Sequence, residues 1–378
     1  MTSRERFRAA LDHREPDRVP IDTGQDLHNG IHEVAYRNLL EHLGLSDDIV
    51  QYDLMQHLVK VREDILERLH VDTRYIFCGP PANYEFEREL DGSWKDEWGI
   101  LRKPCGYYDE SIGHPLEGLD AAKIDAYRMP DPRDGARFAG LRNRARELYT
   151  GTDYALIAGN PGTLFFLSSE LVGFQEYMEK ILSETPLIER LVDMLLEYWI
   201  EFFDAYLGEI GDYVEMVWLG DDWGMQHGPI MNPELFRRIF KDRYRTLLSS
   251  IKEKHDVKVA LHSCGSVVWA LDDLIEAGFD VLHPLQGDAG ENLDAREIKA
   301  RYGDRLTFYS NLRNQSVIPH GTPGEVEADV REKIRALAPG GGYIVSGGHN
   351  IQPDVPPENI IALFDTAFRD GRYPIRAG

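Results

Sequence analysis

The sequence predicts an α/β fold, a (β/α)8 TIM barrel in which eight parallel strands alternate with helices. Three observations favour it. Short β-branched, apolar runs recur eight times, amphipathic segments separate them, and no low-complexity tract or flexible linker divides the chain. Alternating strands and helices are typical of parallel sheets, and eight such units close a barrel. The 378 residues, 42% of them hydrophobic, suffice for one large core, so we expect a single domain over residues 1–378.

The eight predicted strands are short apolar runs, each of which ends at a polar or glycine-bearing turn. They cover residues 18–22, 72–77, 154–158, 213–219, 258–261, 280–282, 306–309 and 342–345. Because the carboxyl ends of barrel strands form one face, the residues that follow these runs should gather at one site.

The helical segments between the strands carry apolar residues at three- and four-residue spacing. Residues 186–200 are a clear case, and residues 233–240 begin with Asn232 in the cap position and Pro233 at the first helical position. The rhythm breaks at residues 80–132, where the pair Asp91–Gly92 predicts a hairpin turn. We expect this excursion, inserted after the second strand, to cover the active face of the barrel.

Composition excludes several classes of function. The net charge of −23 repels phosphate backbones and anionic lipid, so we expect neither nucleic acid nor a membrane as a partner. Three cysteines (Cys78, Cys105 and Cys264) are too few for a disulfide framework, which favours a reducing cytoplasm. Neither a signal peptide nor a membrane-length apolar run is visible. A homodimer is compatible with the sequence, which carries no signal for oligomeric state.

The most informative motif is His262-Ser-Cys264, at the end of the fifth predicted strand. Alternate side chains of an extended chain share a face, so the imidazole and the thiol can reach one point. His349 follows the eighth strand and can reach the same face of the barrel. Two imidazoles and one thiolate with an open fourth position are typical of a catalytic zinc site. Cysteine is also common as a small buried hydrophobe, so the motif alone is weak evidence for zinc.

Other polar residues lie at or near the strands of the predicted barrel. Asp221 and Asp222 follow the fourth strand and are the predicted catalytic carboxylates, although aspartates at such positions more often cap a turn. Gln286, Asn160 and Tyr154 are the predicted substrate contacts, with a structural role for Gln286 as the alternative. His283, on the same rim, is predicted to be structural rather than ligating.

These segments resemble the uroporphyrinogen decarboxylase superfamily over nearly the whole chain. The likeness rests on residues 4–21, 159–164, 262–265, 321–326 and, most specifically, 348–360. The resemblance implies a barrel and one of two chemistries. True uroporphyrinogen decarboxylases carry an arginine-rich segment that binds substrate propionates, and an aspartate that holds the pyrrole nitrogens. The equivalent stretch here, residues 22–28, has no arginine, and Gly79 stands at the position of the aspartate.

The other branch contains zinc methyltransferases that work with a corrinoid protein, and His262 and Cys264 match its zinc-binding pair. The third ligand in thiol-methylating members is usually a second cysteine, whereas His349 stands here, as in the decarboxylases. A centre with one thiolate is a stronger Lewis acid than one with two, which suits activation of an ether or amine leaving group.

The resemblance therefore implies a zinc-dependent demethylase that passes a methyl group from a small methoxylated or N-methylated substrate to the cobalamin of a partner corrinoid protein. Asp222 or Asp221 would be a fourth ligand or a proton donor. The alternatives are a metal-independent decarboxylase of a smaller substrate, in which His349 transfers protons, and a binding barrel without catalysis of its own.

Overall fold

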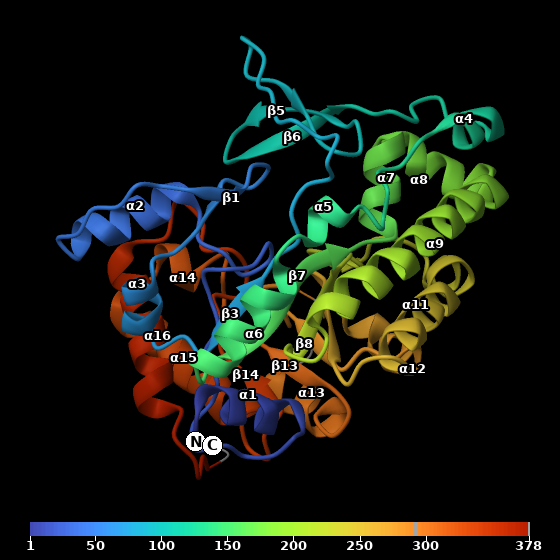
Figure 1. Ribbon diagram of the computed structural model, residues 1–378. Coiled ribbons are helices and arrows are strands. Elements are labelled where there is room, and N and C mark those ends of the chain that lie inside the picture. The colour runs from blue at the N-terminus through green and yellow to red at the C-terminus, as the bar shows by residue number, and fades with distance from the viewer. Residues whose placement is uncertain (291–293, 377–378) are drawn as a thin grey trace.

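A seven-stranded parallel sheet forms the centre of the protein in the computed structural model (Figure 1), which describes residues 1–290 and 294–376, without the side chains of residues 160 and 161. The strand order is β14-β13-β12-β11-β8-β7-β3, so neighbours in space are neighbours in sequence. The strands are β3 (Thr73–Ile76), β7 (Ala155–Gly162), β8 (Met216–Gly220), β11 (Lys258–His262), β12 (Val281–His283), β13 (Thr307–Tyr309) and β14 (Tyr343–Ile344). The predicted TIM-barrel-like α/β fold is confirmed, with seven of the eight predicted runs forming regular strands.

The eighth predicted run, residues 18–22, bridges the two edges of this sheet without forming a regular strand. Ile21 makes a parallel bridge to Val345, just past β14, and its carbonyl accepts a hydrogen bond of 2.8 Å from the amide of Asp72, next to β3. The amide of Val345 in turn donates to the carbonyl of Pro20 at 2.9 Å. Pro20 has no N–H to donate, which limits the ladder at this point.

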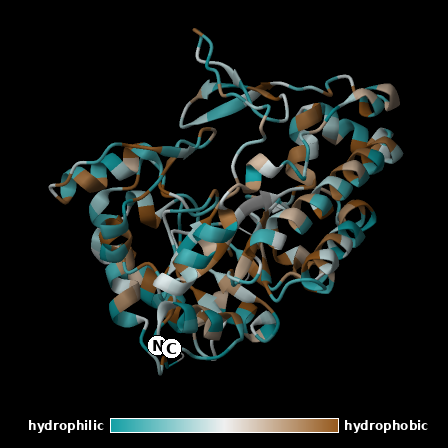
Figure 2. Ribbon diagram, in the orientation of Figure 1, coloured by the Kyte–Doolittle hydropathy of each residue, from teal (hydrophilic) through white to brown (hydrophobic). Residues whose placement is uncertain are grey.

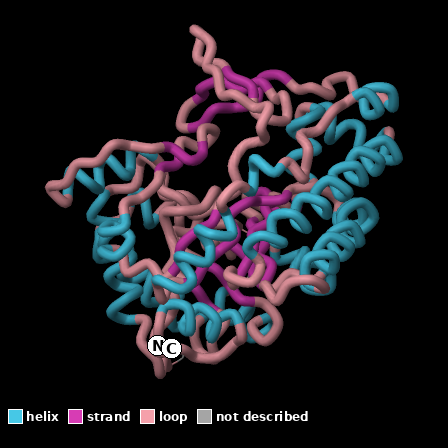
Figure 3. The backbone as a smooth tube through the Cα atoms, viewed as in Figure 1, coloured by secondary structure: helices cyan, strands magenta, loops and turns pink. Residues whose placement is uncertain are grey.

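Helices surround the sheet (Figure 3), and the two chain termini lie close together at its lower end (Figure 1). The predicted helix 186–200 lies within α9, whereas the predicted helix 233–240 is divided between α10 and a π-helical turn. The helices are α1 (Ser3–Leu11), α2 (Glu33–His42), α3 (Glu63–Arg68), α4 (Ala121–Ala126), α5 (Gly135–Phe138), α6 (Leu141–Gly151), α7 (Phe165–Val172), α8 (Phe174–Ser183), α9 (Thr185–Ile210), α10 (Pro233–Phe236), the π-helix Arg237–Lys241, α11 (Asp242–Lys252), the 3₁₀-helix Val268–Ala270, α12 (Leu271–Ala277), α13 (Ala295–Tyr302), α14 (Val317–His320), α15 (Pro323–Leu337) and α16 (Pro357–Asp370).

The longest helix, α9, shows why these segments cover the sheet. Its buried positions include Ile188, Leu191, Leu195 and Phe202, which recur at helical spacing and form one apolar stripe. Hydrophobic and hydrophilic stretches alternate along the outer helices in Figure 2, as expected when one face packs inward. No helix within the described residues is long and apolar enough to cross a membrane.

Residues 80–132 leave the barrel and form a small antiparallel sheet above its mouth (Figure 1). Its strands are β4 (Trp94–Lys95), β5 (Leu101–Cys105) and β6 (Tyr108–Gly113). The predicted turn at Asp91–Gly92 is confirmed: Arg88 makes an antiparallel bridge to Trp94 across it, the Glu89 amide donates to the Ser93 carbonyl at 2.8 Å, and Gly92 has φ +85°. A second tight turn at Gly106, where φ is 69°, joins β5 to β6. Two further short pairs, β1 (Gln51–Asp53) with β2 (Leu58–Val59) and β9 (Gly224–Met225) with β10 (Gly228–Pro229), belong to loops outside the central sheet.

Candidate metal centre

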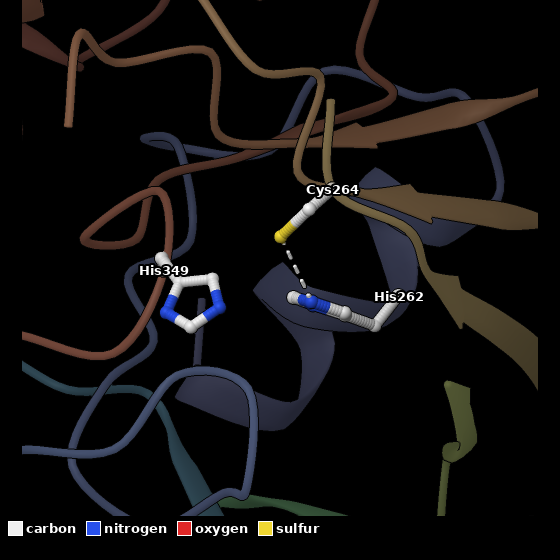
Figure 4. A group of neighbouring side chains, drawn as sticks. All are labelled: His262, Cys264 and His349. Atoms are coloured by element: carbon white, nitrogen blue, oxygen red, sulfur yellow. Dashed lines mark hydrogen bonds between the residues drawn. The ribbon is translucent and has the colours of Figure 1, made fainter. Parts of the chain in front are cut away.

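His262, Cys264 and His349 come together at the carboxyl ends of the strands (Figure 4). His262 ends β11, Cys264 follows in the next loop, and His349 lies in the loop after β14. One potential ligand atom from each lies within 4.8 Å of the others, and the Cys264 Sγ is 3.3 Å from the His262 Nε2. The rings of His262 and His349 are 5.3 Å apart at 70°. The three predicted metal residues are therefore neighbours, although they span 88 residues of sequence.

This donor set fits a zinc ion. Zinc bonds of about 2.0–2.3 Å in a tetrahedron place ligand atoms about 3.3–3.8 Å apart, and the His262–Cys264 pair already has that spacing. Burial lowers the pKa of His349 to about 4 and that of His262 well below its usual range, so both imidazoles are neutral, as ligands must be. Burial also raises the pKa of the Cys264 thiol, so the thiol loses its proton only when a cation is present to stabilise the thiolate.

The loop that carries Cys264 is held tightly from three sides. The Cys264 amide donates to Asp222 Oδ1 at 2.7 Å, and the Gly265 amide donates to Gln286 Oε1 at 2.7 Å. Gly265 has φ +79°, and a Cβ there would lie 2.5 Å from the carbonyl carbon of Gly224. Only glycine fits this conformation and this approach, so the backbone fixes the direction of the Cys264 side chain.

His283 contacts the metal centre from behind, on the strand next to His262. Their Nδ1 atoms are 2.9 Å apart, and the His283 Nε2 lies 3.4 Å from the Ser346 hydroxyl. If His262 binds a metal through Nε2, its Nδ1 carries the proton and donates to His283 Nδ1. His283 then carries its own proton on Nε2, facing Ser346. Such outer contacts fix the tautomer of a ligand and its ring orientation. The sequence predicted a structural role for His283, and the structure identifies the ring that it supports.

We expect His283→Phe to weaken zinc binding by about 10–100-fold, because it removes the acceptor of the His262 Nδ1 proton while keeping a ring in the space. His283→Asn, whose amide oxygen can accept that proton, should restore much of the affinity. Competition with a chromogenic chelator measures both variants. Equal affinities for the wild type and His283→Phe would contradict the tautomer argument.

The two neighbouring aspartates have different surroundings. Asp221 is 2% exposed, and its carboxylate accepts the backbone amides of Leu164 at 2.8 Å, Phe165 at 3.2 Å and Phe166 at 2.6 Å, at the start of α7. The hydroxyl of Tyr244 donates to the same carboxylate. Burial raises the pKa of Asp221 to about 6, against the lowering effect of these donors. Asp221 thus caps a helix, which was the alternative interpretation of the sequence.

Asp222 is the carboxylate that faces the metal residues. It lines the same cavity, and its Oδ1 is 3.8 Å from His262 Nε2 while it holds the Cys264 amide. Although its side chain is 43% exposed, desolvation within the cavity raises the pKa of Asp222 above its usual value. This position lets the carboxyl group hold a proton near the metal centre.

Two of the three predicted substrate contacts, Gln286 and Tyr154, can be placed, and neither lines the cavity beside the metal residues. Gln286 is 4% exposed and supports the Cys264 loop from behind, as described above. Tyr154 lies before the amino-terminal end of β7, where its ring packs 3.6 Å below the Arg74 guanidinium. It is therefore at the opposite end of the barrel from the metal residues, because strand β7 separates the two ends. The Asn160 side chain lies outside the described part of the structure.

Sequence reasoning missed His28, which stacks on His262 with ring centroids 4.2 Å apart. Asp26 orients it through its Oδ1, 3.0 Å from His28 Nδ1. A Cβ at Gly220 would lie 2.4 Å from His28 Nε2, so glycine at the end of β8 leaves room for this imidazole. The available signal was position, because His28 follows the first of the predicted strand runs.

A cavity of about 310 Å³, here called the metal cavity, opens above these residues. Six of its seventeen lining residues are acidic, and the excursion 80–132 contributes four of the seventeen. It is lined by Leu27, His28, Asp53, Met55, Gln56, Arg102, Tyr108, Asp109, Glu110, Thr163, Phe166, Glu170, Gly220, Asp221, Asp222, His262 and His349. The one arginine, Arg102, already pairs with Asp96 at 2.9 Å and Glu170 at 3.0 Å. The cavity therefore disfavours a polyanionic ligand.

Comparison with known proteins places this barrel in a family. The family model described as uroporphyrinogen decarboxylase (URO-D) matches residues 111–369, more than half of the chain. The uroporphyrinogen decarboxylase of Thioalkalivibrio sulfidiphilus is 26% identical over 275 residues, which cover 70% of this chain and 74% of the relative. The methylcobamide:CoM methyltransferase MtaA of Methanosarcina barkeri is 27% identical over 257 residues, which cover 68% of this chain and 69% of the relative.

A solved structure shares the fold over nearly the whole chain. It is a methyltransferase from Methanosarcina mazei, with a TM-score of 0.67 and 19% sequence identity, and the match covers 98% of this chain and 99% of that one. The fold is thus shared over nearly the whole chain, and methyltransferases and decarboxylases are both among the relatives. This chain belongs to the uroporphyrinogen decarboxylase family.

Proposed function

We propose that this protein is a zinc-dependent methyltransferase, which removes a methyl group from a small methoxylated or N-methylated substrate and passes it to the Co(I) corrinoid of a partner protein. The observation that carries the proposal is the convergence of His262, Cys264 and His349 beside a cavity. The relationship to a methylcobamide:CoM methyltransferase supports the same reaction class.

Zinc held by this triad would supply a Lewis acid that polarises the leaving oxygen or nitrogen of the substrate. The chain's own residues have supporting tasks. His283 and Ser346 hold the tautomer of His262, while Asp222, Gln286 and Gly265 fix the loop of Cys264. Asp222 would hold the proton that the leaving atom takes up. The excursion 80–132 would limit access of water, because Arg102, Tyr108, Asp109 and Glu110 line the metal cavity.

The substrate-binding surface argues against a porphyrinogen. Uroporphyrinogens carry many carboxylates. The metal cavity is lined by six acidic side chains, which would repel them, and by one arginine that is already paired. A decarboxylase for a smaller substrate, with His349 as the proton-transfer group, is the alternative that the test must separate.

The test combines a metal assay with a turnover assay. We expect purified protein to hold about one zinc per chain and to convert free cob(I)alamin to methylcobalamin, followed by absorbance, with at least one donor from a screen of methanol, methoxylated aromatics and methylamines. Protein without stoichiometric zinc would contradict the proposal and favour the decarboxylase. Zinc-loaded protein that transfers no methyl group from any donor would favour a binding barrel without catalysis.

A further inference from the structure

A second cavity of about 350 Å³, here called the aromatic chamber, adjoins the metal cavity. It lies between the excursion, the β1–β2 loop and helices α7 and α9. The two cavities share seven lining residues, which form the boundary between them: Leu27, Asp53, Met55, Arg102, Thr163, Phe166 and Glu170. A ligand in the chamber therefore lies next to the metal cavity, whose lining includes His262 and His349.

Aromatic rings make up much of the chamber wall. They are Tyr52, Tyr84, Trp94, Trp98, Phe166, Tyr198, Trp199 and Phe202. Trp98 from the excursion meets Tyr198 of α9 edge to face, with centroids 4.9 Å apart. Such packed rings present rigid apolar surface to a flat ligand at a low cost in conformational entropy.

Three of these rings have their polar atoms occupied elsewhere. The Trp199 Nε1 donates to the Thr163 carbonyl at 2.6 Å, and the Trp94 Nε1 donates to Asp109 Oδ2 at 2.6 Å. The Tyr84 hydroxyl donates to the Lys95 carbonyl at 3.0 Å. The three rings can therefore offer their carbon surfaces rather than hydrogen-bond donors to a ligand.

The two arginines that line the chamber are already paired. Arg102 pairs with Asp96 and Glu170, and Arg137, which is 4% exposed, pairs with Glu97. Within the described part of the chain, neither cavity is lined by an arginine or lysine that lacks a carboxylate partner. A carboxylate on the ligand would thus meet acidic neighbours without a free cation, which disfavours an anionic ligand.

We propose that the chamber binds the ring of an uncharged aryl methyl ether, with the methoxy group beside His262, Cys264 and His349. This deepens the proposed function and rests on it. In methyl transfer the acceptor, the methyl carbon and the leaving oxygen lie on one line, with the acceptor opposite the oxygen. The bent C–O–C angle of an ether places the aryl ring to the side of this line. The metal cavity would admit the acceptor, and the chamber beside it would hold the ring.

The reaction balances with the two reactants named. The bond between the methyl carbon and oxygen breaks, and its electron pair stays on the oxygen, which takes up a proton to give a phenol. The Co(I) of the partner's corrinoid supplies both electrons of the new cobalt–carbon bond and is formally oxidised to Co(III).

Direct binding tests the chamber without turnover. Calorimetry of the zinc-loaded protein should show saturable binding of methoxybenzene, and at least about tenfold weaker binding of 4-methoxybenzoate. Trp98→Ala should weaken methoxybenzene binding by about tenfold or more, because it removes one wall. Phe166→Ala should weaken it too, and since Phe166 is 39% exposed this variant should fold normally. Phe174→Ala, a matched aromatic control at 53% exposure that lines neither cavity, should bind normally.

The outcomes separate the chamber from the proposed function. Equal affinity in the wild type, Trp98→Ala and Phe166→Ala, or a preference for 4-methoxybenzoate, would overturn the chamber proposal. Transfer from methanol to cob(I)alamin without methoxybenzene binding would overturn the chamber alone. Binding with the expected variant pattern but no methyl transfer would support the chamber as a ring-binding site and overturn the methyltransferase.

Discussion

Replacing Cys264 with serine is expected to abolish stoichiometric zinc binding. The substitution exchanges the one soft thiolate of the triad for a hydroxyl that stays protonated, and leaves two imidazoles. We expect the metal content to fall from about one zinc per chain to near zero after dialysis against a mild chelator, with methyl transfer lost in parallel. Elemental analysis of the dialysed protein gives the metal content directly.

Cys105→Ser is the matched control, because Cys105 is exposed in β5 and lies outside the group of residues that could bind the metal. It should retain zinc and activity. Full zinc retention in Cys264→Ser would mean that the triad does not hold the metal, and the proposed function would fail with it.

Asp221→Ala is expected to destabilise the protein by about 3 kcal/mol or more. The substitution leaves three backbone amides at the start of α7 and the Tyr244 hydroxyl buried without their acceptor. Each unsatisfied buried donor costs about 1–3 kcal/mol, partly offset because a costly buried carboxylate is removed. Urea denaturation of the two proteins measures the difference in the free energy of unfolding.

Asp222→Ala is the neighbouring comparison. The Asp222 side chain is 43% exposed and accepts the single amide of Cys264, so its loss should cost about 1 kcal/mol or less. The same substitution should weaken zinc binding, because the Cys264 loop loses one support. Similar destabilisation by both substitutions would contradict the division of the two aspartates into a helix cap and a site residue.

The barrel could be predicted because its strands and helices follow from local patterns of apolar residues. Each apolar run between helical segments marks a strand, and seven of the eight became regular strands of one parallel sheet. Residues 18–22 show the limit of such patterns. Whether this run forms a strand depends on hydrogen bonds to Val345 and Asp72, far away in sequence, and on the missing N–H of Pro20.

The metal residues were predictable for a related reason. His262 and Cys264 are two apart at a strand end, and the barrel rule places His349 on the same face. His28 and His283 also follow predicted strand runs, but position alone does not say that their rings contact His262. His283 supports His262 because β11 and β12 pair in a register that sets these two residues opposite each other, and register is a property of the sheet. Tyr154 shows the converse: it begins its predicted run, and the same barrel rule places that end opposite the metal residues.

By itself, the sequence determined the barrel, the three candidate metal residues and the family resemblance, because strand periodicity and motif spacing are encoded over a few adjacent residues. Only the tertiary structure decided which aspartate caps a helix and which faces the metal residues, and that an aromatic chamber lies beside them. Asp221 and Asp222 are adjacent and chemically identical, and they differ only in the partners that folding brings to each: helix α7 and Tyr244 for one, the loop of Cys264 for the other. Burial and hydrogen bonding to distant segments assign such roles, and a linear pattern does not contain them.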